Sequence, residues 1–200
     1  MAFNIESFKS QGLQFGGARP SLFRVILSFP AGVSTGALAL NGGRASFLVK
    51  SAALPASTIG EIDVSYFGRK IKLAGDRTFD DWTITILNDE DFQLRNAMEE
   101  WSNLMNTLIS NRLDAVGPAT PDTYKVDLEV QQFGKSGPGD DSGVIRAYRF
   151  VGAFPTQVSA ITLDWDRNNT IEEFDVRFAY DYWEPILTST PIYDPILSSP

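Results

Sequence analysis

Alternation of apolar and polar side chains over residues 59–88 places the strongest constraint on what this chain can fold into. It runs through IGEIDVSYFGRKIKLAGDRTFDDWTITILN, with a turn at Phe67-Gly68 and a renewed alternation over residues 82–86. A period of two is typical of half-buried strands, so the segment predicts a long hairpin and a return strand. The hairpin is charged on one side and has few apolar residues near its tip. It cannot bury enough surface to be ordered alone, and we expect it to need a partner.

The same period of two recurs through most of the chain. Further strands are predicted over residues 22–29, 47–53, 124–130, 146–153, 158–165 and 170–183. Stretches that contain Pro and Gly separate them, as is usual for turns and loops. About eight or nine strands result, which favours an antiparallel barrel or sandwich.

One segment has a different period. Between Glu90 and Ser110, apolar residues fall three and four positions apart and predict an amphipathic helix. The stripe consists of Leu94, Ala97, Met98, Trp101, Leu104, Met105 and Leu108. Each large residue is worth about 1.5–3 kcal/mol when buried, so we expect the stripe to pack on the sheet, with Leu94, Met98, Trp101 and Met105 in the core. The predicted fold class is mainly β: an antiparallel β-barrel or sandwich with one packed α-helix and a long protruding hairpin.

Length and the two ends of the chain indicate a subunit of a larger assembly. A chain of 200 residues is expected to form one domain that buries roughly 70% of its unfolded surface. We assign this domain to residues 21–184. Residues 1–20 carry scattered large apolar side chains and are predicted to form an N-terminal arm, and residues 185–200 repeat Pro-Ile-Leu and are predicted to form an extended C-terminal arm.

Composition narrows the function classes. The formal net charge of −8 disfavours an electrostatic grip on nucleic acid phosphates. The chain has no cysteine and no histidine, which removes disulfides, thiolate nucleophiles, most zinc and iron sites and the commonest general base. No cofactor is expected. No apolar run approaches the roughly 20 residues of a transmembrane helix and no signal peptide is evident, so we expect assembly in a cytoplasm.

Two short motifs approach ligand-binding patterns without completing them. Residues 164–175 match several positions of a calcium loop, but Asn169 replaces its glycine and Asp175 its final glutamate. A polar turn between strands is the favoured interpretation. Gly134-Lys135-Ser136 lacks the earlier glycine of a phosphate loop, because Glu129 stands there.

Three long pieces of the chain together resemble a known family. They are YFGRKIKLAGDRTFDDWTITILND, the helix with Trp101, and RAYRFVGAFPTQVSAITLDWDRNNTIEEFDVRFAYDYWE. In this order they resemble the tail tube protein family of contractile-tailed bacteriophages, over about residues 22–184. The resemblance implies a structural protein and no enzyme: hexameric rings closed through edge strands and stacked into a hollow tube.

The resemblance also implies partners and a location. The tube lies inside a contractile sheath, grows from a baseplate tube initiator around a tape-measure protein, and is capped by a tail terminator. Viral DNA passes through its lumen without sequence-specific binding. The expected location is therefore the tail tube of a virion that is assembled in the host cytoplasm.

Two sets of site residues follow from this expectation. The hairpin tip is expected to reach the next ring through Phe67, Gly68, Arg69, Lys70, Ile71, Lys72, Leu73, Asp76 and Arg77. Its basic residues, with Asp63, Asp76, Asp80 and Asp81, offer charge complementarity for the register between rings. A basic bore would bind DNA and slow its exit, so lumenal negative charge is expected from Asp127, Glu129, Glu173 and Asp175.

Other functions stay open on the sequence alone. Two share the fold: a tube subunit of a bacterial contractile injection system related to type VI secretion, which would carry effectors, and a baseplate protein that initiates the tube as a single ring. A carboxylate-dependent enzyme such as a glycoside hydrolase would use Glu172, Glu173 or Asp175 in a concave site. A monomeric β-barrel binding module would need an internal ligand cavity.

Overall fold

The computed structural model describes residues 16–33, 44–111, 120–135 and 143–186, with five isolated positions among the first fifteen. The strands are β1 (Phe23–Ile26), β2 (Val49–Ala52), β3 (Thr58–Tyr66), β4 (Arg69–Thr78), β5 (Trp82–Leu87), β6 (Val126–Phe133), β7 (Val144–Val158), β8 (Glu173–Ala179) and β9 (Tyr182–Ile186). The helices are α3 (Ala45–Leu48), α4 (Gln93–Met105) and the 3-10 turn η3 (Pro121–Thr123). None of these described helices has the length and apolar character that crossing a membrane requires.

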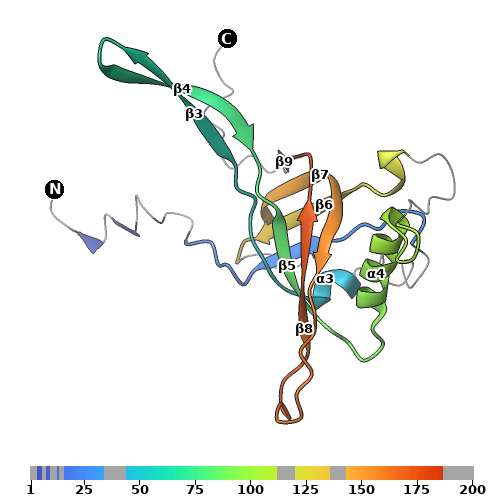
Figure 1. Ribbon diagram of the computed structural model, residues 1–200. Helices are drawn as coiled ribbons and strands as arrows, with labels where there is room; N and C mark the ends of the chain where they lie inside the picture. Colours follow the sequence, from blue (N-terminus) through green and yellow to red (C-terminus); the bar gives the residue numbers. More distant parts are fainter. Residues whose placement is uncertain are drawn as a thin grey trace.

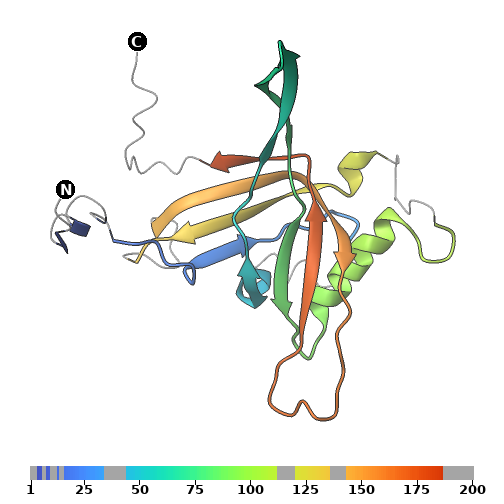
Figure 2. The same ribbon diagram turned by 60° about the vertical axis from the view of Figure 1, so that its left-hand side comes forward.

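Seven strands form one antiparallel sheet in the order β1-β6-β7-β8-β5-β2, with β9 pairing β7 off this path. Strand β7 joins the two halves, since its first part pairs β6 and β9 and its last part, from Phe154 to Val158, pairs β8. Between them lies Gly152 with φ +66, where an added Cβ would lie 2.4 Å from an Asp181 carboxylate oxygen. The chain thus turns at a position that only glycine fits. In Figures 1 and 2, β1 and β6 run across the direction of β5 and β8.

The core lies between these two halves and α4. Trp82 stacks on Phe150 with ring centroids 4.2 Å apart, and Trp101 of α4 packs 6.0 Å from Phe178. The largest fully buried side chains are Trp101, Phe150, Phe174, Phe178, Ile84, Ile86 and Met98. The predicted fold class is confirmed: antiparallel β-structure, one main packed helix and a protruding hairpin, β3–β4.

Helix α4 is shorter than predicted. Phe92 adopts a left-handed conformation (φ 53) just before the helix, and Asn106 is extended just after it. The structure buries Leu94, Met98 and Trp101 and leaves Met105 half-buried. Leu108 is 89% exposed, so its assignment to the buried stripe is wrong, because the helix ends before the stripe does.

Strand boundaries also differ from the prediction in three places. Residues 158–165 do not form a strand, because β7 ends at Val158 and a loop follows to residue 172. Residues 170–183 form two strands, β8 and β9, separated at Asp181, whose N–H donates to the Val151 carbonyl. The predicted strand over 47–53 begins with α3 instead.

The arms are described only in small part. Half of residues 1–20 and all of residues 187–200 lie outside the described residues. At its C-terminal end the domain extends past the expected boundary at residue 184, because β9 continues through Pro185 and Ile186. Pro185 is tolerated there because β9 is an edge strand.

Candidate assembly surfaces

The hairpin β3–β4 is the most exposed element of the described structure. Every residue of β3 is exposed, and the two strands pair only with each other within the described sheets. Its tip is formed by Phe67 (φ 44) and Gly68 (φ 76), so both central residues of the turn have positive φ. Such turns match the twist of a hairpin and favour Asn-Gly. Phenylalanine is costly at this position, yet its side chain is 89% exposed and contacts only the ring of neighbouring Tyr66 among the described aromatic residues.

The two faces of the hairpin differ in chemistry. The register Ile62↔Leu73 and Val64↔Ile71 places apolar side chains on one face, each about half exposed. We call Ile62, Val64, Tyr66, Ile71 and Leu73 the apolar hairpin face. Such a face is expected to be covered in the working form of the protein.

The opposite face carries ion pairs internal to the hairpin. Lys70 pairs with Asp63 at 3.1 Å, and Lys72 pairs with Glu61. Each of these exposed lysines therefore has an acidic partner within the hairpin. Arg69, at the tip, forms no ion pair with any other described residue. It lies next to the turn, farther from the base than Arg77, which likewise has no described ion pair.

Aromatic side chains fix the base of the hairpin to the core. Trp82 Nε1 donates to the Ala53 carbonyl at 2.8 Å, and Trp183 Nε1 donates to the Ala56 carbonyl at 3.1 Å. Phe79 packs against the rings of Tyr180 and Trp183. The segments that lead into β3 and out of β4 are therefore both held against the core. The hairpin projects from the core as a supported extension (Figure 1).

Tyr180 beside this base has a perturbed acidity. Burial raises the pKa of Tyr180, and the nearby carboxylates of Asp80 and Asp81 raise it further. The direction of this shift favours the neutral phenol, as suits a residue that packs at the base of the hairpin.

The four acidic residues proposed for a lumen do not gather on one strand. Asp127 and Glu129 lie on β6, whereas Glu173 and Asp175 lie on β8. Each has a described partner. Asp127 accepts from the Gly152 N–H and Glu129 from the Gln131 side chain, while Glu173 pairs with Lys50 and Asp175 accepts from the Thr85 hydroxyl. They form two separate acidic pairs on strands that flank different halves of β7.

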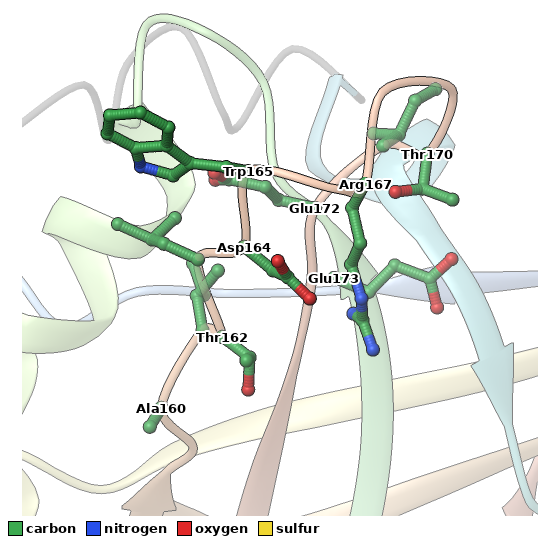
Figure 3. Close-up of a pocket in the computed structure, with 11 residues that line it drawn as sticks. Ala160, Thr162, Asp164, Trp165, Arg167, Thr170, Glu172 and Glu173 are labelled. Atoms are coloured by element: carbon green, nitrogen blue, oxygen red, sulfur yellow. The ribbon is translucent and has the colours of Figure 1, made fainter.

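Residues 159–172 form an exposed loop where the sequence predicts the end of a strand followed by a polar turn. It extends beyond the end of β8 and lines an open pocket together with Glu173 (Figure 3). Trp165 is 97% exposed, and Leu163 and Ile171 are also exposed. In Figure 3 the Trp165 indole points away from the pocket while Asp164 and Arg167 point into it. The alternation of Ile161, Leu163 and Trp165, which predicts a strand, is the sequence signal that points to apolar side chains at this surface.

The chain is similar to known proteins in both sequence and fold. The profile described as phage tail tube protein matches residues 18–185. The chain belongs to this family. The tail tube protein gp19 of Enterobacteria phage T4 is 36% identical over 167 residues, covering 84% of this chain and 91% of that protein.

Solved structures share the fold at low identity. The cap of the anti-feeding prophage aligns with TM-score 0.56 at 17% identity, covering 85% of this chain and 91% of that one. The sheath-tube complex of an extracellular contractile injection system aligns with TM-score 0.51 at 14% identity, covering 92% and 99%. These likenesses bear on the fold alone.

Family membership confirms the main expectations from the sequence. The chain is a structural tail tube subunit that assembles with itself, a component of a phage virion, and not an enzyme. The glycoside hydrolase alternative is thereby set aside.

Proposed function

We propose that copies of this chain close into hexameric rings through their free sheet edges, and that the rings stack through the β3–β4 hairpin into a hollow tube. The observation that carries this proposal is the hairpin itself. It is exposed along its length, apolar on one face and held at its base, which suits an element built to be covered by a second copy.

Ring closure is supported by the sheet topology. Within the described sheets, β1, β2 and β9 each pair on one side only. A strand with an unpaired edge is a template for a strand of another chain. In a cyclic arrangement, edge pairing between neighbours removes these edges all the way round the ring.

The hairpin tip residues are the proposed contacts between rings. Phe67, Ile71 and Leu73 supply apolar surface, and Arg69 supplies a charge without a described counter-ion. Lys70 and Lys72 support the tip from within by their ion pairs with Asp63 and Glu61. Asp76 and Arg77 lie closer to the base, on β4. Together, all of these hairpin residues set the register between rings.

The two acidic pairs are the proposed source of negative charge in the lumen, through which DNA passes without specific binding. The net charge of −8 is consistent with a bore that repels phosphate. Because the pairs lie on different strands, they can be tested separately. Neutralising the pair that lines the bore, either Asp127 with Glu129 or Glu173 with Asp175, should slow genome ejection from otherwise intact virions. Unchanged ejection for both pairs would refute the lumen assignment.

The wider partners are also proposals. A contractile sheath outside the tube, a baseplate initiator, a tape-measure protein and a terminator would complete the tail, with assembly in the host cytoplasm. A chain of the same fold was solved as part of a sheath-tube complex, which supports a sheath as partner. We further propose that residues 1–20 and the part of 185–200 that follows β9 act as arms that reach neighbouring subunits.

Electron microscopy of the purified protein across a concentration series tests the central proposal. Six-fold rings or hollow tubes are the expected result, with purified baseplates added as nuclei if the protein alone stays monomeric. Many stacked rings would separate a tube subunit from a single-ring initiator. Particles that remain monomeric with baseplates present would overturn the proposal.

A further inference from the structure

The 159–172 loop lies at the opposite end of the described molecule from the hairpin tip. Both views show the hairpin projecting from one end and this loop, below β8, from the other (Figures 1 and 2). Two features at opposite ends are placed to meet when copies stack head to tail. A heterologous contact of this kind propagates from copy to copy without limit.

The loop is held in shape by polar contacts at its ends and its turn. The Ser159 N–H donates to the Asp175 carbonyl at 2.8 Å, and Asn88 holds Glu172 through both its backbone and its side chain. At the turn, Asp164 Oδ1 accepts from the Asp166 N–H at 3.1 Å. The loop therefore presents a defined surface.

That surface is apolar and acidic on balance, since Asp164, Asp166 and Glu172 outnumber its one basic residue, Arg167. Leu163 is 78% exposed and Ile171 69%, beside the almost fully exposed Trp165. These side chains do not belong to either buried cluster of the described core. The carboxylate of Asp166 has no ion pair among the described residues, and the Asp164 carboxylate lies in the same turn, where it accepts from the Asp166 N–H.

The hairpin tip has the complementary character. Tyr66 and Phe67 are exposed aromatic side chains, and Arg69, next to the turn, is a basic group without a described ion pair. An aromatic and cationic tip therefore faces one way, and an aromatic and anionic loop the other. Arginine also stacks favourably on tryptophan.

We propose that the 159–172 loop is the receptor for the hairpin tip of a second copy of this chain in the adjacent ring. Phe67 packs against Leu163 and Trp165, and Arg69 lies beside Asp166. This inference rests on the proposed stacking of rings and adds to it the surface on which the hairpin docks.

Cysteine cross-linking tests the pairing directly, because the natural chain has no cysteine. A variant with Arg69→Cys and Asp166→Cys is assembled under reducing conditions, checked for tubes by electron microscopy and treated with a short bis-maleimide. Covalent chains longer than a hexamer are expected, since each link joins one ring to the next. The matched control combines Arg69→Cys with Asp122→Cys on η3, away from both surfaces, and should give no chains.

The outcomes separate this inference from the proposed function. Tubes without cross-links, or chains that stop at the hexamer, would overturn the docking site while ring stacking survives. Failure of the natural chain to form tubes, even on baseplates, would overturn the proposed function instead.

Tryptophan quenching gives a second measurement that does not need the cysteine variant to assemble. Trp82 and Trp101 are buried in the subunit, whereas Trp165 is open to solvent. The Trp165→Phe variant identifies the part of the fluorescence that comes from Trp165. When the natural chain assembles, acrylamide quenching of that part should fall several-fold. A Trp165 that stays equally quenchable in bare tubes would show that the loop is free for another tail component, contrary to the proposal.

Charge exchange provides the specificity control. Arg69→Glu and Asp166→Lys should each weaken tube formation, and their combination should restore it in large part. Asp122→Lys changes the net charge equally and should leave tube formation unchanged. If the combined variant is no better than either single one, the two residues are not neighbours in the tube.

Discussion

Helix α4 and the hairpin β3–β4 both carry an apolar face, yet the subunit buries only one of them. Leu94, Met98 and Trp101 of α4 are at most 4% exposed, whereas Ile62 and Leu73 of the hairpin are each 52% exposed. The periodicity of the sequence predicts both faces equally well. The comparison shows that an apolar pattern indicates that a face will be covered, but not whether the same copy or another one covers it.

The difference divides the apolar residues of this chain by the equilibrium that they control. Those on α4 stabilise the folded subunit against unfolding. Those on the hairpin are expected to stabilise contacts between subunits and to contribute little to the subunit alone. Substitutions in the two regions should therefore act on different measurements.

Trp101→Ala should produce the largest loss of subunit stability. The side chain is fully buried, stands against Phe29 and Phe178, and donates to the Tyr124 carbonyl at 2.8 Å. Its removal leaves a cavity and should lower the free energy of unfolding by about 3–5 kcal/mol, measured by chemical denaturation of the monomer. Leu108→Ala is the matched control at an exposed position and should stay within about 0.5 kcal/mol. Unchanged stability of Trp101→Ala would refute its place in the core.

Deletion of residues 70–76 should have the opposite effect: subunit stability should change little, and stacking of rings should be lost. These residues belong to β4 and make no described pairing outside the hairpin, so the monomer should keep its fold by circular dichroism and its thermal midpoint. Stacking should be lost, as observed by electron microscopy and sedimentation. Normal tubes from the deletion variant would contradict the role assigned to the hairpin.

Phe67→Asn should separate the two equilibria within one residue. Asparagine tolerates the positive φ of this position better than phenylalanine does, so the isolated hairpin should gain about 0.5–1 kcal/mol. Slower hydrogen exchange of the β3–β4 amides would show this gain. Assembly should weaken at the same time, because an exposed aromatic contact is lost. If assembly is unaffected, Phe67 is not a contact between rings.

The sequence predicts elements whose partners lie close along the chain better than surfaces that depend on distant parts. The hairpin was predicted because its alternation and its Phe67-Gly68 turn are local. The segment with Ile161, Leu163 and Trp165 alternates in the same way but is a loop, because β8 begins only at Glu173 and offers no strand alongside it to pair with. The acidic residues show a similar limit, since alternation tells which of them share a face but not which face meets a lumen.

The smallest expected effect concerns the start of α4, where the buried helix meets solvent. The N–H of Gln93 donates to Asp91 Oδ1 at 3.1 Å, and Arg44 pairs with Asp91 at 2.6 Å. The backbone hydrogen bond, aided by Arg44, lowers the pKa of Asp91. A lowered pKa means that the stabilisation is complete above the usual value of an aspartate, about 3.9, and is lost as pH falls through the lower folded value.

Carboxyl titration by NMR measures this effect residue by residue. Arg44→Met should raise the pKa of Asp91 only part of the way back to its usual value, because the larger cause of the lowering, the hydrogen bond from the Gln93 N–H, remains. Asp91→Asn should slightly lower stability near neutral pH and reduce its acid dependence below about pH 4. A full return of the Asp91 pKa to its usual value in Arg44→Met would assign the effect to the ion pair instead. The helix start would then depend on Arg44, which precedes α3, more than on its own backbone.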